Sequence, residues 1–152
     1  MAISWTSPTH KISNHFTVKD ACLLPSWGVM HHPSLIEEAN ILAMAASMEK
    51  VRAIVGKPIN VHCWIRPTLA NCPGPHYMGN YNLAAGSTAP HSAHILGNAV
   101  DWDCGDDCDS TRAFLLPHIE ALGLRMENRP GSTWIHLDCV PVPPGGHRFF
   151  LP

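Results

Sequence analysis

The sequence predicts an α+β fold in which a small antiparallel or mixed sheet packs against one long helix and several short ones. One observation is an apolar stripe at steps of three and four between residues 35 and 55, which is typical of an amphipathic helix. A second is a set of short β-branched or alternating segments at residues 58–66, 98–103, 124–127 and 134–139. A third is that helices and strands do not alternate strictly, which favours α+β over a doubly wound sheet.

Length and composition indicate a single globular domain spanning residues 1–152. Hydrophobic residues make up 45% of the 152 residues, so the chain is neither disordered nor collagen-like. The 10 Lys and Arg against 12 Asp and Glu give a net charge of −2, which argues against a nucleic-acid partner. Glu, Lys, Pro or His residues interrupt every apolar run within a few positions, so we expect no membrane span.

Histidine and cysteine are the unusual components of this composition. The 11 His outnumber the 10 Lys and Arg, which raises the question of whether some of them hold a metal. The first residues contain no basic stretch followed by an apolar one, so no secretory signal is visible. Free thiols are therefore the default expectation for the 6 Cys, with a local Cys104–Cys108 disulfide as the alternative in an oxidising compartment.

Two capping boxes define the helices of the first half. Residues 1–33 are predicted to form an N-terminal arm, in which residues 17–20 open a short helical turn. Ser34 and Glu37 form the second capping box, and Gly56 supplies a C-terminal stop. The long helix is therefore predicted between Ser34 and Gly56.

The middle of the chain is predicted to contain a strand followed by a long loop. Residues 58–66 alternate, which puts Ile59, Val61, Cys63 and Ile65 on one face of a strand. Residues 67–90 are rich in Gly, Pro, Asn and Ser and show no periodicity, so they are predicted to be a loop that forms one wall of a cleft.

The second half is predicted to contain a helix, a hairpin and a tail. The helix runs from residue 111 to 122 after a cap at Asp109 or Ser110, with a kink at Pro117. The strands at 124–127 and 134–139 are joined by a turn at 128–132. Residues 140–152 are rich in Pro and Gly and are predicted to be an extended tail.

Two segments combine residue types and spacings that are typical of a metal site. The first ends the long loop with His94 and reaches Asp101, on a strand, seven residues later. The second places His136 and Asp138 on the same face of a later strand. Two histidines and one carboxylate leave a fourth position open, as a catalytic zinc site requires, and a water there has its pKa lowered toward about 7. The predicted sheet thus carries a zinc site.

These segments together resemble a known protein family. The patterns Ser-x-His-x-x-Gly-x-Ala-x-Asp at 92–101 and Trp-x-His-x-Asp at 134–138 are similar to motifs of the zinc D-alanyl-D-alanine carboxypeptidases. That family includes murein endopeptidases and phage endolysins and shares its metal core with hedgehog signalling domains. Residues 12–20, and residues 51–61 followed by Arg66, resemble two further segments of the family, so the resemblance covers residues 12–139.

The resemblance implies roles for individual residues. By position, His94, Asp101 and His136 match the zinc ligands of the family. Arg66 matches the arginine that contacts substrate and helps to stabilise the transition state, a role that suits a permanently charged, forked guanidinium. Ser92 is expected to support the loop that carries His94 through a hydrogen bond.

The general base has two candidates. Many relatives carry an acidic residue about three positions before the last histidine ligand, where this chain has Thr133. Glu127 ends the strand before the turn, so hairpin pairing would set it beside His136. Asp138 shares a face with His136 and is the other candidate. We favour Glu127 as the base and expect Asp138 to orient a ligand or a substrate amine.

These expectations together describe a zinc-dependent peptidase that hydrolyses a peptide bond in bacterial peptidoglycan, with the peptide stem as its partner. The family resemblance implies carboxypeptidase or endopeptidase action by a phage-encoded enzyme at the bacterial cell wall. The missing acid at Thr133 leaves open a non-catalytic binding or structural domain of the same fold that zinc stabilises. A second alternative is a metallohydrolase for small dipeptides.

Overall fold

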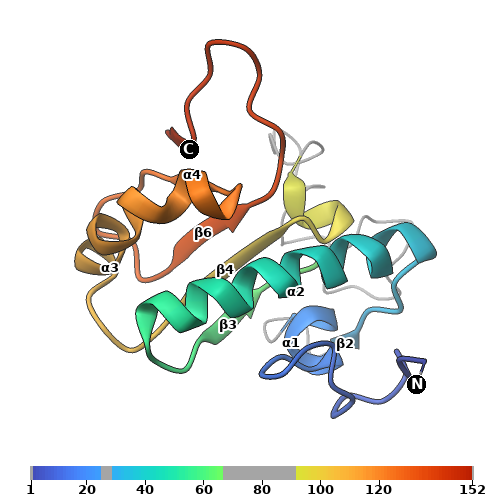
Figure 1. Cartoon of the computed structure of the whole chain (residues 1–152). Coiled ribbons are helices and arrows are strands. Elements are labelled where there is room, and N and C mark those ends of the chain that lie inside the picture. The colour runs from blue at the N-terminus through green and yellow to red at the C-terminus, as the bar shows by residue number, and fades with distance from the viewer. Residues whose placement is uncertain (1, 25–28, 67–91, 152) are drawn as a thin grey trace.

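The computed structural model describes residues 2–24, 29–66 and 92–151, and it confirms the α+β fold (Figure 1). The predicted loop at 67–90 lies outside the described residues. The α-helices are α1 (Val18–Cys22), α2 (Leu35–Val55), α3 (Cys108–Leu115) and α4 (Ile119–Leu122), with short 3₁₀ helices η4 (Ala93–Leu96) and η5 (Leu116–His118). The strands are β1 (Leu23–Leu24), β2 (Val29–Met30), β3 (Asn60–Cys63), β4 (Ala99–Asp103), β5 (Arg125–Glu127), β6 (Ile135–Asp138) and β7 (Phe149–Phe150).

A five-stranded mixed sheet organises the molecule, with strand order β3-β4-β6-β5-β7. All of its neighbouring strands are antiparallel except β5 and β7, which are parallel. Strands β1 and β2 form a separate antiparallel pair. The predicted hairpin of residues 124–139 is confirmed by the pairing of β5 with β6.

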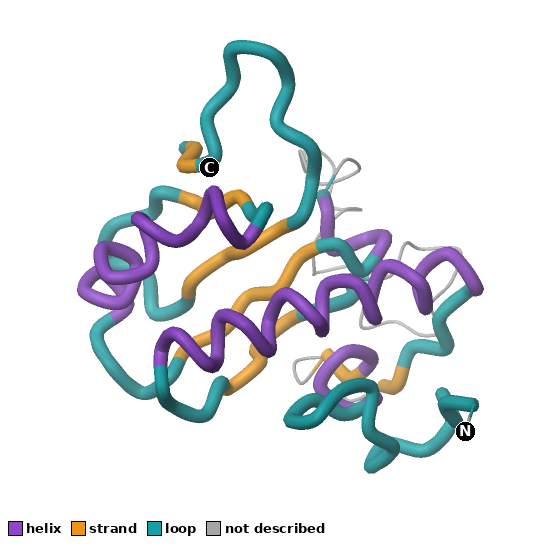
Figure 2. Tube along the Cα trace, in the orientation of Figure 1, coloured by secondary structure: helices purple, strands orange, loops and turns teal. Residues whose placement is uncertain are grey.

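The sheet has one face for the core and one for polar side chains. Paired residues share a face, so Val100, Leu137 and Met126 form one row and Trp102 with Ile135 another, all fully buried. The apolar stripe of α2 packs against this face, and Figure 2 shows α2 running along the direction of the strands. The neighbouring positions on β4 and β6 therefore project their side chains from the opposite face.

The ends of the long helix agree with the sequence prediction. Ser34 accepts a hydrogen bond from the backbone of Glu37, and the Glu37 side chain accepts one from the backbone of Ser34. Gly56 ends α2 in the left-handed region at φ 71°. The capping box predicted at residues 17–20 is also present, at the start of α1.

The helix predicted at 111–122 has different boundaries. It begins three residues earlier, at Cys108, because Asp107 caps it by accepting from the backbone N–H of Ser110. Pro117 divides the segment more sharply than a kink would, since it lies in η5, between α3 and α4.

Two strand predictions also need correction. A bulge between Val61 and Cys63 pairs Val61 with Trp102 but Cys63 with Asp101, so these two side chains lie on opposite faces, not on the predicted common face. The tail predicted at 140–152 contains β7, which pairs with β5. Among the described residues, no helix combines the length and apolarity needed to cross a membrane.

Candidate metal centre

The two predicted motif segments meet where β4 lies beside β6. Asp101 on β4 is paired directly with His136 on β6, so both side chains project from the polar face of the sheet. His94 lies on η4, which is joined to β4 by a turn at Gly97 in the left-handed region. The carbonyl of His94 accepts a hydrogen bond from the backbone N–H of Arg66 at 2.9 Å, which ties η4 to the segment that follows β3.

Three ligand-type atoms converge at this point. His94 Nε2 lies 3.2 Å from Asp101 Oδ1 and 3.2 Å from His136 Nδ1. His136 Nδ1 lies 2.8 Å from Asp101 Oδ1. Ligand atoms at about 2.0–2.1 Å from a tetrahedral zinc are about 3.3 Å apart, so this triangle is close to the size of one face of such a site.

The other nitrogen of each histidine has a hydrogen-bond partner. His94 Nδ1 donates to the carbonyl oxygen of Trp64 at 2.8 Å. His136 Nε2 lies 3.3 Å from Asp138 Oδ2, to which it can donate. A proton on each outer nitrogen leaves a lone pair on the inner one, directed into the triangle, which is how metal-binding histidines are usually oriented.

A buried group of Cys63, His94 and Asp101 can bind a metal ion. Each of the three residues places a ligand atom within 4.8 Å of the others, and Cys63 is paired with Asp101 across β3 and β4. The Cys63 Sγ atom lies 3.7 Å from His94 Nδ1, the nitrogen that also contacts Trp64. The five described cysteines are free thiols, so Cys63 is available as a donor.

Charge and burial in the triangle shift the pKa values of its members. Burial lowers the pKa of His94, but the neighbouring Cys63 and Asp101 outweigh burial and raise that pKa to about 10. Burial acts to raise the pKa of Asp101, but the positive charges of His94 and His136 keep it well below its ordinary value. At neutral pH, the protein without metal therefore carries a proton on His94 that a bound metal would displace.

A small cavity opens beside the triangle. Its volume is about 180 Å³, and its described lining consists of Arg66, Ser92, His94, Asp101, Glu127, Arg129, Trp134 and His136. Continuing the β5–β6 register by one residue sets Glu127 opposite His136, on the same face. The Arg66 guanidinium lies 3.5 Å from Asp101 Oδ2. Glu127 and Arg66 thus both border the same space as the convergent ligand atoms.

Asp138 is placed differently from Glu127. Its side chain is almost fully buried and accepts two hydrogen bonds from Arg125, at 2.8 and 3.0 Å, and one from the backbone of Val140 at 2.9 Å. Together with the contact to His136, these hydrogen bonds occupy both oxygens of the carboxylate. Asp138 is absent from the described lining of the cavity, so its observed contact with the site is through His136.

The residues that the structure brings together at this cavity include most of the predicted site residues and two that were not predicted. His94, Asp101, His136, Glu127 and Arg66 were all predicted, and the structure brings them to one cavity. Ser92 accepts a hydrogen bond from the His94 backbone, as expected. Cys63 and Arg129 were not predicted. The proximity of Cys63 depends on the bulge in β3, for which strand alternation gives no signal.

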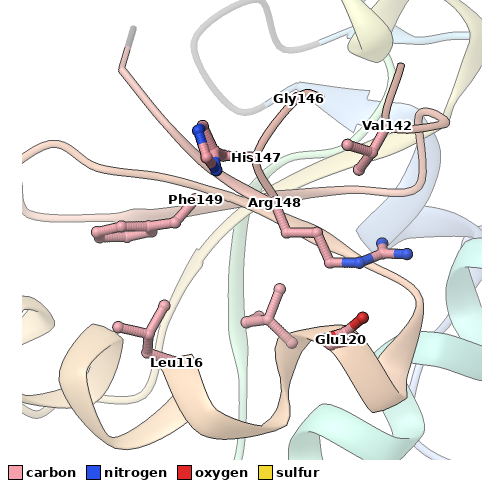
Figure 3. A pocket seen from close by; sticks show the side chains of 8 residues that line it. Leu116, Glu120, Val142, Gly146, His147, Arg148 and Phe149 are labelled. Atoms are coloured by element: carbon pink, nitrogen blue, oxygen red, sulfur yellow. The ribbon is translucent and has the colours of Figure 1, made fainter. Parts of the chain in front are cut away.

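A larger cavity of about 650 Å³ lies away from this centre, between η5, α4 and the C-terminal segment (Figure 3). Leu116, Ile119 and Phe149 supply apolar surface, and Glu120 is the one carboxylate among its lining residues. It shares no lining residue with the metal centre and lacks a convergent set of ligands in the described chain. The described residues that could bind a metal therefore lie at the smaller cavity.

Comparison with known proteins adds no assignment. No protein-family model, curated protein or solved structure matches this chain.

Proposed function

We propose that this protein is a zinc metallopeptidase of the D-alanyl-D-alanine carboxypeptidase type, with His94, Asp101 and His136 as ligands. The observation that carries the proposal is the triangle of their inner atoms, with sides of 2.8, 3.2 and 3.2 Å. The outer nitrogens support it, because the Trp64 carbonyl and Asp138 favour the tautomers that leave both inner lone pairs free.

The alternative third ligand, Cys63, fits less well than His136. Its Sγ atom approaches the Nδ1 side of His94, where the Trp64 carbonyl already accepts a hydrogen bond. His136 Nδ1 instead faces His94 Nε2, the nitrogen directed at Asp101. We assign Cys63 to packing beneath His94 and His136 to the metal.

The chemistry follows from this ligand set and the cavity beside it. His94, Asp101 and His136 would hold the zinc, which would supply Lewis-acid chemistry and lower the pKa of a bound water toward about 7. Glu127 takes a proton from the attacking water and passes it to the leaving amine, since its strand position sets it opposite His136. Arg66 binds a substrate carboxylate or the oxyanion.

Asp138 is an orienting residue in this mechanism. Its carboxylate is held by Arg125 and by the backbone of Val140, and its remaining contact is to His136 Nε2. A buried carboxylate held this firmly fixes the ring of His136 and is poorly placed to shuttle protons. The base role therefore goes to Glu127.

The proposed substrate is a peptide bond of bacterial peptidoglycan, and the proposed site of action is the bacterial cell wall. Both rest on the motifs at 92–101 and 134–138, which resemble those of the peptidoglycan peptidases. The cavity is compatible with a peptide substrate because it pairs a carboxylate with two arginines next to the ligand atoms. A phage-encoded lysin is the kind of enzyme in which we expect such motifs and such a cavity.

Release of soluble peptides from purified cell walls tests the proposal. We expect zinc-loaded protein to release them, chelator to abolish release, and added zinc to restore it. The Glu127→Gln variant should keep zinc and lose about 10²–10⁴-fold in rate, the usual contribution of a general base. Zinc-loaded protein that binds metal but releases nothing from walls or dipeptides would support the non-catalytic alternative. Cleavage of dipeptides alone would support the dipeptide hydrolase.

A further inference from the structure

Arg129 is a second arginine at the metal cavity, to which the sequence patterns gave no role. Arg66 follows β3 and Arg129 follows β5, and these strands flank β4 and β6, which carry Asp101 and His136. The two guanidinium groups therefore come from opposite sides of the ligand cluster. A peptide lying across the cluster would run from one arginine toward the other.

Arg129 differs from the other arginines around the site in its partners. Arg66, Arg112 and Arg125 each lie near a carboxylate, as Arg66 does near Asp101. Within the described part of the chain, Arg129 has no ion-pair partner, and its side chain is exposed. Its guanidinium carbon lies 5.0 Å from the ring centre of Trp134, another lining residue. The aromatic face holds the charge in position without neutralising it.

The loop that carries Arg129 is fixed from the N-terminal end of α3. Asp109 accepts hydrogen bonds from the backbone N–H of Gly131, at 3.0 and 3.2 Å, and is paired with Arg112. The almost fully buried Arg112 donates to Ser132 Oγ and to the carbonyl of Trp134, both at 3.0 Å. A guanidinium on a loop held this way loses little freedom when it binds an anion.

We propose that Arg129, supported by Trp134, is the specificity-determining group that binds a free carboxylate of the substrate peptide. An arginine binds a carboxylate through two parallel hydrogen bonds, which a neutral carboxamide cannot accept in the same way. The inference rests on the proposed function for its substrate class. It adds that the preferred peptide carries a free carboxylate close to the scissile bond, and it leaves the oxyanion to Arg66.

The test compares one acetylated peptide ending in D-alanyl-D-alanine, as the free acid and as the C-terminal carboxamide. Binding of each form to zinc-loaded Glu127→Gln protein is measured by calorimetry, which needs no turnover. We expect the acid to bind about 10- to 100-fold more tightly, the range of a charge-assisted contact. Adding Arg129→Met should abolish this preference, whereas Arg129→Lys should retain part of it.

Arg52→Met is the matched control, because it removes one cation from α2, outside the described lining of the cavity. It should leave the preference for the acid unchanged. Equal binding of acid and carboxamide, no binding of either, or a preference that survives Arg129→Met would overturn the proposal. A separate assay measures hydrolysis of cell walls by the wild-type chain. If walls are hydrolysed but the preference for the acid is absent, the role of Arg129 is wrong while the proposed function stands; if walls are not hydrolysed, the proposed function itself fails.

Discussion

At the scale of single residues, the site depends on which nitrogen of each histidine faces inward. His94 directs Nε2 and His136 directs Nδ1 toward Asp101, so the two rings use different atoms. The partner of the outer nitrogen makes that choice, a backbone carbonyl for His94 and a carboxylate for His136. Replacing the carboxylate partner should therefore weaken metal binding without removing a ligand.

Asp138→Asn tests this dependence. The amide keeps the shape of the side chain but loses the charge that favours a proton on His136 Nε2, so we expect zinc affinity to fall about 10- to 100-fold. At saturating zinc, most of the hydrolytic rate should return, in contrast to Glu127→Gln. Competition with a chromogenic chelator measures the affinity. Unchanged affinity with a lost rate would instead assign the base role to Asp138.

The protonation of His94 predicts how the stability of the metal-free protein depends on pH. Its pKa is raised to about 10 by Cys63 and Asp101 against the opposing effect of burial, from about 6.5 in an unfolded chain. A raised histidine pKa stabilises the folded state below the unfolded value and loses this contribution as pH rises toward the folded value. Metal-free protein should therefore become less stable from about pH 6.5 upward.

Urea unfolding with chelator between about pH 6.5 and 8 checks this trend. The window stops at about pH 8 because, at higher pH, the ionisation of buried thiols also changes the free energy of unfolding. Cys22 is an example, because burial raises the pKa of its thiol to about 12. Zinc-loaded protein should lack the loss due to His94, since the metal has already displaced its proton. Metal-free stability that stays level or rises across the window would show that His94 is not protonated as described.

At the scale of elements, the turn between η4 and β4 positions His94 over the sheet. Gly97 occupies the left-handed region at φ 75°, and a Cβ there would lie 2.8 Å from Ile41 Cγ1. Ile41 is fully buried in α2, so it has little room to move. The tight turn and the packing of η4 on the long helix thus both require glycine at this position.

Gly97→Ala should destabilise the fold by about 2–4 kcal/mol, through left-handed strain and overpacking together. Gly131→Ala is a matched control, because that glycine has φ 76° but nothing within 4 Å of the place that an alanine methyl would occupy. It should cost only the strain, about 1–2 kcal/mol. Urea unfolding gives both values. Equal losses in the two variants would mean that the contact with Ile41 is unimportant.

Local patterns predicted most elements, and pairing between strands decided the rest. The ends of α2 were predictable because Ser34, Glu37 and Gly56 act within a few residues of themselves. Predicting that Asp101 lies beside His136 required the spacing of the two motifs as well as the alternation of side chains along each strand. The Cys63 bulge depends on how β3 aligns with β4, and β7 exists through its pairing with β5. Neither depends on a local pattern, so neither was predicted.

At the scale of the whole molecule, the core and the candidate metal centre lie on opposite faces of the sheet. The buried core cluster includes Val100, Trp102, Ile135 and Leu137 from β4 and β6, whereas Asp101 and His136 project the other way. The core is formed by the sheet, by α2 and by residues of α1, α3 and α4, without any of the three proposed ligands. Folding should therefore not require the metal.

Chelation tests this separation. Metal-free protein should keep its far-ultraviolet circular dichroism and unfold cooperatively, in contrast to small zinc domains that are unfolded without metal. Zinc should add stability by mass action, about 2.7 kcal/mol at a free concentration about 100 times the dissociation constant. Loss of secondary structure on chelation would favour a structural role for the metal.

The central claim is that His94, Asp101 and His136, and not Cys63, hold the zinc. Zinc content per chain, measured by elemental analysis after dialysis against a zinc buffer, tests it most directly in two variants. We expect about one zinc per chain in the wild type, nearly the same in Cys63→Ser, and a large loss in His136→Gln, because only the last removes a ligand. Zinc lost in Cys63→Ser and retained in His136→Gln would contradict the claim.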